Sequence, residues 1–157
     1  MNQTKNPKIT FIKACWHSEI VGRCQDGFMG EFSRRGWSTD GVEIIKVPGV
    51  FEIPLLSKKS SNIRKFDAII ASGLVIDGGI YHHEFLATAV IDGLMRVQLE
   101  TGIPVISAVL APHQFNGHET HMNFFAKHFE TKRVETANAC IRILGNFMRF
   151  SNFEKQG

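Results

Sequence analysis

The sequence predicts an α/β protein in which a four-stranded parallel sheet lies between two layers of helices. Strand-length apolar runs alternate with segments of helical spacing along the whole chain, which is the pattern of repeated strand–helix units. One run, 67–74, is almost entirely apolar, as expected for a parallel strand covered by helices on both faces. The 157 residues contain no internal repeat or linker, and 43% of them are hydrophobic. We therefore expect a single domain over 1–157, with flexible ends at about 1–7 and 150–157.

Turn signals and changes of spacing set the bounds of the predicted elements. The strands are expected at 8–14, 42–47, 67–74 and 103–110. The first helix should begin with Ser18 as its N-cap and end at Arg34-Arg35-Gly36. Its buried stripe is expected to contain Ile20, Cys24, Phe28 and Phe32, which follow one another at i, i+4 spacing. Further helices are predicted at 51–60, 82–101, 113–128 and 132–148.

Charge and composition argue against several classes of protein. The formal net charge is +3 and Lys and Arg form no dense stripe, so we expect no nucleic-acid partner. No apolar run approaches the roughly 18 residues of a membrane helix, and residues 1–7 contain no apolar segment like that of a signal peptide. The three cysteines, Cys15, Cys24 and Cys140, are few and widely spaced, which indicates reduced thiols and a cytoplasmic location.

The candidate ligand site lies beyond the carboxyl ends of the strands, where open parallel α/β sheets bind their ligands. Four stretches follow the four predicted strands: 15–17, 48–52, 77–83 and 111–113. Trp16, in the first stretch, can stack on a flat ring, but it equally suits the core or an interface. Glu52, in the second, can accept hydrogen bonds from ligand hydroxyls or can complement the dipole at the start of a helix.

The third stretch, 77–83, combines the glycine turn Gly78-Gly79 with His82 and His83 at the start of a helix. Paired glycines let backbone amides approach a phosphate, or they simply form a tight turn. Histidine titrates near neutral pH and so suits proton transfer. Because neighbouring residues of a helix diverge by about 100°, only one of the two histidines is expected to face a site.

A second group of histidines raises the alternative of a metal site. His118 and His121 are three residues apart and would share one face of a helix, and His113 is near them in the sequence. The run His118-Glu119-Thr120-His121 is one residue shorter than the HExxH motif and does not provide its geometry. We expect no metal, and a metal-dependent hydrolase remains an alternative that metal analysis would test.

Taken together, these stretches resemble lumazine synthase, the penultimate enzyme of riboflavin biosynthesis. The resemblance covers nearly the whole chain and rests on Trp16, the segment Val47-Pro48-Gly49-Val50-Phe51-Glu52-Ile53-Pro54, the segment 75–82 and the run 132–137. The IDGG turn, the doubled histidine and the histidine-rich fourth helix are similar to the type II branch of the family. The resemblance implies a flavodoxin-like three-layer α/β/α sandwich and a transferase that needs no cofactor or metal.

The resemblance also implies a reaction and its residues. Lumazine synthases condense 5-amino-6-(D-ribitylamino)uracil with 3,4-dihydroxy-2-butanone 4-phosphate to give 6,7-dimethyl-8-ribityllumazine, phosphate and water. By motif position, His82 corresponds to the proton-transfer histidine and Trp16 to the aromatic residue that stacks on the pyrimidine ring. The other implied binding residues are Val50, Phe51 and Glu52 for the ribityl chain, Val75 and Ile76 for the ring, Gly79 and Ile80 for the phosphate, and Lys132 from a neighbouring subunit.

The sequence departs from the family pattern around the phosphate. Asp77 stands where the family has arginine, and residues 80–81 replace threonine or proline, which removes a hydroxyl that helps bind phosphate. His121 falls on the position of the family's phosphate-binding arginine in an ungapped count. The alternatives nearby are Lys127 and Arg133. Because neutral histidine binds phosphate less well than arginine, we expect weaker binding of the phosphate substrate, dependent on histidine protonation.

The resemblance finally implies a homo-oligomer with active sites between subunits. Type II enzymes are decamers of two facing pentamers, so we expect a decamer, with the bare pentamer as the alternative. Residues 125–132 replace the short glycine-rich link between the last two helices that sixty-subunit shells tend to have. A flavin- or lumazine-binding module with weak catalysis is the alternative function, and it would use Trp16 and Glu52 without needing His82.

Overall fold

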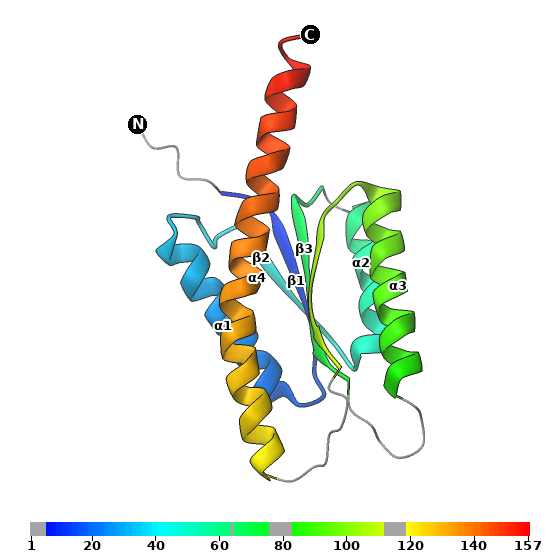
Figure 1. Cartoon of the computed structure of the whole chain (residues 1–157). Helices are drawn as coiled ribbons and strands as arrows, with labels where there is room; N and C mark the ends of the chain where they lie inside the picture. The colour runs from blue at the N-terminus through cyan, green and yellow to red at the C-terminus, as the bar shows by residue number, and fades with distance from the viewer. Residues whose placement is uncertain (1–5, 64, 76–82, 112–118) are drawn as a thin grey trace.

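The structure, a computed structural model, describes residues 6–63, 65–75, 83–111 and 119–157. One sheet contains four strands in the order β2-β1-β3-β4, and every neighbouring pair is parallel. Figure 1 shows α1 and α4 on one face of this sheet and α2 and α3 on the other. The predicted three-layer α/β/α sandwich with a four-stranded parallel sheet is therefore confirmed.

The elements begin and end close to the predicted positions, with the exceptions given below. The strands are β1 Ile9–Ala14, β2 Val42–Val47, β3 Ala68–Leu74 and β4 Val105–Leu110. The helices are α1 Ser18–Arg34, the 3-10 turn η1 Val50–Glu52, α2 Ile53–Ile63, α3 His83–Thr101 and α4 Glu119–Glu154. No helix in the described part of the chain is long and apolar enough to cross a membrane.

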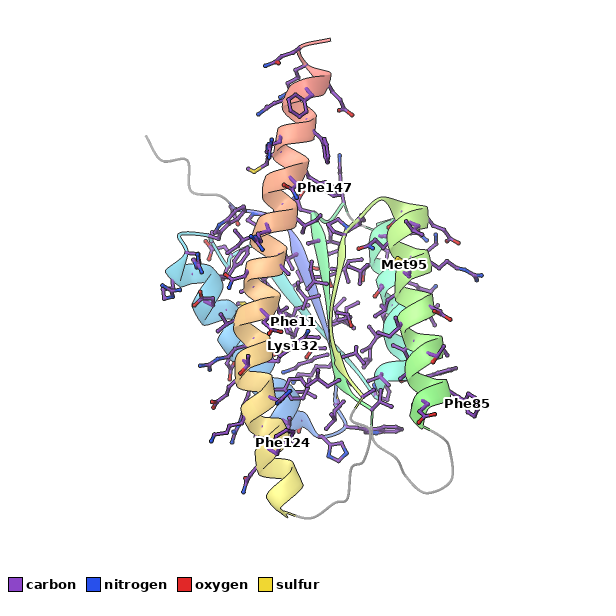
Figure 2. All side chains as sticks on the ribbon, in the orientation of Figure 1. Phe11, Phe85, Met95, Phe124, Lys132 and Phe147 are labelled. Carbon is purple, nitrogen blue, oxygen red and sulfur yellow. The ribbon has the colours of Figure 1, made fainter. Side chains whose placement is uncertain are left out.

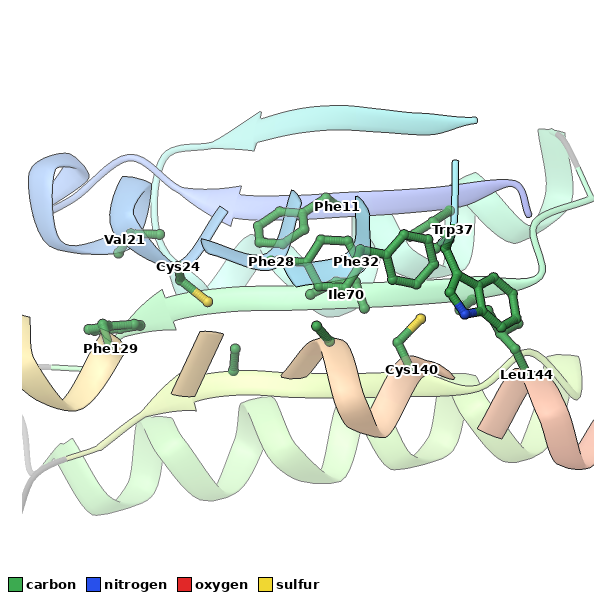
Figure 3. Close-up of a cluster of buried hydrophobic side chains, with 14 of the residues drawn as sticks. Phe11, Val21, Cys24, Phe28, Phe32, Trp37, Ile70, Phe129, Cys140 and Leu144 are labelled. Atoms are coloured by element: carbon green, nitrogen blue, oxygen red, sulfur yellow. The ribbon is translucent and has the colours of Figure 1, made fainter. Parts of the chain in front are cut away.

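Alternate residues of the strands face opposite layers of helices, which divides the core in two. Phe11 of β1 belongs to a cluster with residues of α1 and α4, and its neighbour Ile12 to a cluster with residues of α2 and α3. The strand β3 is buried along its whole length. On the α1–α4 side an aromatic row with ring centroids 5.1 to 5.5 Å apart (Figure 3) contains Phe11, Phe28, Phe32 and Trp37.

Helix α1 confirms the predicted apolar stripe but not the predicted cap. Its buried residues include Ile20, Cys24, Phe28 and Phe32. The N-cap is His17 rather than Ser18, and no side chain caps the helix. His17 has a left-handed conformation (φ 58°), and its carbonyl accepts the N–H groups of Ile20 and Val21. The tight turn after β1, rather than a side-chain cap, decides where this helix begins.

The last two predicted helices are a single helix. We expected 113–128 and 132–148 to be separate, but α4 is continuous for 36 residues. The expected break, 129–131, contains no glycine or proline, and Phe129 within it is fully buried. Burying this face favours an unbroken helix over a turn. The expected flexible end at 150–157 is helical as far as Glu154, and Figure 1 shows this end of α4 running past the sheet.

Candidate functional site

The carboxyl ends of β1, β2 and β3 bring most of the described site candidates to one edge of the sheet. Trp16 follows β1, the turn η1 follows β2, and Val75 follows β3. Pairing continues beyond the ends of β1 and β2: the N–H of Cys15 donates to the carbonyl of Val47 at 2.8 Å, and the N–H of Trp16 donates to the carbonyl of Pro48 at 3.3 Å. These hydrogen bonds hold Trp16 beside the segment that enters η1.

Trp16 presents an exposed aromatic ring at this edge. The residue is 65% exposed, so it does not occupy the core position that the sequence left open. The indole lies against Gly49, because a Cβ at position 49 would be 3.2 Å from both Cε3 and Cζ3 of the ring. A larger residue would have to displace the ring. An exposed indole supported in this way is suited to stacking on a planar ligand.

Glu52 is the last residue of the turn η1, and its carboxylate reaches back to the residue that precedes the turn. Its Oε2 accepts the backbone N–H of Gly49 at 2.9 Å and would lie 3.4 Å from a Cβ at that position. The residue is half-buried. The carboxylate thus stands at a helix start, which is one of the two roles that the sequence left open, and the same hydrogen bond determines its position. Gly49 contacts both groups, so it sets the position of the carboxylate relative to the Trp16 ring.

The remaining described candidates at this edge differ in what they expose. Val50 is 3% exposed and Val75 is 1% exposed, so their side chains belong to the core and only their backbones are left for a ligand. The N–H of Val75 already donates to the carbonyl of Leu110 at 2.8 Å. Phe51 is 67% exposed, and its ring is accessible for an apolar contact.

Lys132 does not join this group within one protomer. It lies on α4 (Figure 2), its side chain is 31% exposed, and its Nζ is 3.6 Å from Oε2 of Glu135. Burial raises the pKa of the Cys24 thiol, and the positive charge of Lys132 acts in the opposite direction. Cys24 packs on the α1–α4 side of the sheet, whereas Val50 packs on the α2–α3 side. Lys132 and η1 therefore lie over opposite faces of the sheet.

Part of the predicted site lies outside the described residues. These candidates are Ile76, Gly79, Ile80 and His82, together with His113 and His118 of the alternative metal site. His83 and His121 lie in α3 and α4, but the structure does not describe their side chains. Within the described portion, no group of three or more His, Cys, Asp or Glu side chains could hold a metal ion.

Sequence reasoning missed the structural role of two glycines. Gly49 adjoins Trp16 and Glu52, and Gly73 of β3 adjoins Val50 and Ala14. Gly73 had a signal in the sequence, because a glycine inside an apolar strand often marks the close approach of another part of the chain. Nothing local indicates which segment approaches, since that depends on the order of the strands.

The chain is similar to known proteins over most of its length. The family model for 6,7-dimethyl-8-ribityllumazine synthase matches residues 6–147. A 6,7-dimethyl-8-ribityllumazine synthase of Rhodococcus erythropolis is 49% identical over 139 residues, which are 88% of this chain and 90% of that protein. The 6,7-dimethyl-8-ribityllumazine synthase 2 of Pseudomonas syringae pv. tomato is 42% identical over 151 residues, which are 96% of this chain and 89% of that protein.

A third relative carries the same name as the second. The 6,7-dimethyl-8-ribityllumazine synthase 2 of Bradyrhizobium diazoefficiens is 47% identical over 140 residues, which are 89% of this chain and 84% of that protein. The family-model match over residues 6–147 includes the strands and the turn that build the edge around Trp16 and η1. From matches of this length and identity we conclude that the chain belongs to the 6,7-dimethyl-8-ribityllumazine synthase family.

Proposed function

We propose that the edge formed by Trp16 and η1 is where this chain catalyses the lumazine synthase reaction of riboflavin biosynthesis. The substrates are 5-amino-6-(D-ribitylamino)uracil and 3,4-dihydroxy-2-butanone 4-phosphate, and the products are 6,7-dimethyl-8-ribityllumazine, phosphate and water. The observation that carries this placement is the exposed Trp16 indole against Gly49, next to the Glu52 carboxylate. A planar apolar surface beside a hydrogen-bond acceptor suits a substrate with a flat ring and a hydroxylated chain.

The chemistry needs two reactants held together and protons moved near neutral pH. The amine attacks the ketone and loses water to give an imine, phosphate is eliminated, and ring closure onto the second carbonyl releases another water. Holding both reactants in one site supplies a large part of the rate, and a positioned acid–base group adds about 10²–10⁴-fold. We assign ring stacking to Trp16, binding of the ribityl chain to Glu52 and the backbone of Val50 and Phe51, and proton transfer to His82.

Phosphate binding is assigned to His121 with the turn at Gly79 and Ile80. Of the alternative cations, Arg133 packs the stem of its side chain against Gly27 of α1, which supports a structural role for that arginine. Because protonated histidine binds phosphate more strongly than neutral histidine, KM for the butanone phosphate should be lower at pH 6 than at pH 8. A KM that is the same at both pH values would contradict a histidine phosphate site.

We also propose that the chain is a cytoplasmic homo-oligomer, and that it forms a decamer of two pentamers in which Lys132 serves a neighbouring subunit. Ile91, Met95 and Leu99 are exposed on α3 at i, i+4 spacing, and Figure 2 shows Phe85 of the same helix pointing away from the sheet. An exposed apolar stripe supports a protein contact. Light scattering should give about 176 kDa for ten chains of 17.6 kDa, and about 88 kDa would support the pentamer.

A direct assay with both substrates, following the fluorescence of the lumazine product, tests the function. The wild type should form product in the presence of EDTA, because the proposed reaction uses no metal. His82→Ala should lower kcat by about 10²–10⁴-fold. Full activity of this variant would remove the proton-transfer role from His82, and His83→Ala would then test its neighbour. Binding of lumazine without any product from the wild type would favour the binding-module alternative.

A further inference from the structure

We infer that Gly73 is a positioning residue of this site, which acts through Val50 on the turn that carries Phe51 and Glu52. The inference rests on the proposed function, because it assumes that η1 binds the pyrimidine substrate. Gly73 lies in the buried strand β3 and pairs with Val109 of β4. It is not among the glycines with positive φ, so its backbone conformation is open to any residue. The requirement for glycine here is one of space.

The space that a side chain at position 73 would need is occupied by Val50. A Cβ on Gly73 would overlap Cγ1 of Val50, and it would lie 3.2 Å from Cβ of Ala14 and 3.6 Å from Cδ1 of Ile53. The most exposed of these three neighbours, Val50, is only 3% exposed, so none can swing into solvent to make room. The absence of a side chain at Gly73 therefore lets Val50 lie directly against the sheet.

The segments around this contact lead into the site. Ala14 ends β1 just before Cys15 and Trp16, and Val50 begins η1. Val50 also follows Gly49, whose N–H holds the Glu52 carboxylate and whose α-carbon adjoins the Trp16 ring. A displacement of Val50 would therefore move the Glu52 carboxylate and also Gly49, which supports the indole. In this way Gly73 affects the site from within the sheet.

Filling this space should weaken substrate binding at η1. An added methyl group must push the turn away from the sheet, and a displacement of about 1 Å can lower the rate about 10²-fold. Because the displaced groups are those assigned to the pyrimidine ring and ribityl chain, KM for the pyrimidine should rise more than KM for the butanone phosphate. We expect Gly73→Ala to raise the pyrimidine KM at least about tenfold.

The experiment compares steady-state kinetics of the full-length oligomer for wild type, Gly73→Ala, Val50→Ala and the double variant. In the double variant the methyl group at position 73 takes the volume that the γ-methyl groups of Val50 vacate, so the pyrimidine KM should return to within about threefold of wild type. Gly30→Ala is the matched control, because a Cβ there meets nothing within 4 Å. Thermal melting of each variant separates a loss of fold from a loss of positioning.

Several results would overturn the inference. One is wild-type kinetics in Gly73→Ala, and another is a folded double variant as impaired as Gly73→Ala. If Gly73→Ala does not fold, the double variant is compared with Val50→Ala, and a higher pyrimidine KM in the double variant contradicts the inference. Absence of product from both wild type and Gly30→Ala would instead overturn the proposed function, so the two failures are distinguishable.

Discussion

The two faces of the sheet are packed differently, and the described part of the site is built on one of them. On the α1–α4 face, Phe28 lies between Phe11 and Phe32, with ring centroids 5.5 and 5.1 Å away. The α2–α3 face is aliphatic; both faces include alanines, and on this one Ala14 lies beside Gly73, where Val50 of η1 packs. Large rings fill space and bury apolar area, whereas small residues and glycine allow η1 to approach the strands closely. Packing for stability and packing for position are thus assigned to opposite faces.

The largest effect on stability is expected from Phe28→Ala on the aromatic face. Removing a fully buried ring that contacts two others should lower the free energy of unfolding by about 3–5 kcal/mol. Urea unfolding followed by circular dichroism measures this loss, and Phe28→Leu is the control with a smaller cavity. KM for the pyrimidine in the folded fraction should stay within about twofold of wild type. A large rise in KM would show that the aromatic face also positions the site.

The opposite result is expected from Gly49→Ala at the site edge. The added Cβ would stand 3.2 Å from the Trp16 ring, so the ring must give by a few tenths of an ångström. We expect the pyrimidine KM to rise about three- to tenfold, with a change of less than about 1 kcal/mol in the free energy of unfolding. Gly22→Ala is the matched control, because a Cβ at position 22 meets nothing within 4 Å. An unchanged KM would show that the position of the Trp16 indole does not affect pyrimidine binding.

The cysteines report how closely the aromatic face is packed. Burial, with a smaller effect from the negative charge of Asp67, raises the pKa of the Cys140 thiol to about 12, and burial also raises the pKa of Cys24. Cys15 is exposed. At pH 8 a thiol reagent should therefore label one thiol per native chain and three after unfolding. Cys15→Ser should abolish the native signal, and rapid labelling of a second thiol would show that the aromatic face opens.

The smallest effect is expected from Glu100→Gln, which removes a surface ion pair between α2 and α3. The Nζ of Lys58 lies 2.9 Å from Oε2 of Glu100, and this hydrogen bond and charge lower the pKa of Glu100 below 4.5. The pair stabilises the fold above that pH and loses its effect as the pH falls and the carboxylate is protonated. The difference in melting temperature between variant and wild type should be small at pH 7 and should vanish as the pH falls and the Glu100 carboxylate is protonated. A difference that persists at low pH would show that the substitution acts through packing rather than through the ion pair.

Much of the fold could be predicted because the apolar pattern of a segment is a local property of the chain. The apolar run of β3 and the stripe of α1 identified both elements and their buried residues. The same reasoning was wrong for α4, because whether a helix continues through 129–131 depends on what covers Phe129. It was also wrong for the cap of α1, where the turn at His17 replaces a side-chain cap.

For the site, the sequence by itself determined that Trp16 and Glu52 follow strands of one parallel sheet, and therefore meet at its carboxyl edge. Only the tertiary structure decided that the Trp16 ring lies against Gly49 and that Lys132 stands over the opposite face. The contact of Gly73 with Val50 was decided in the same way. The reason is physical: these close approaches join residues far apart in the chain, and they follow from strand order and from which side chains are small enough to permit them.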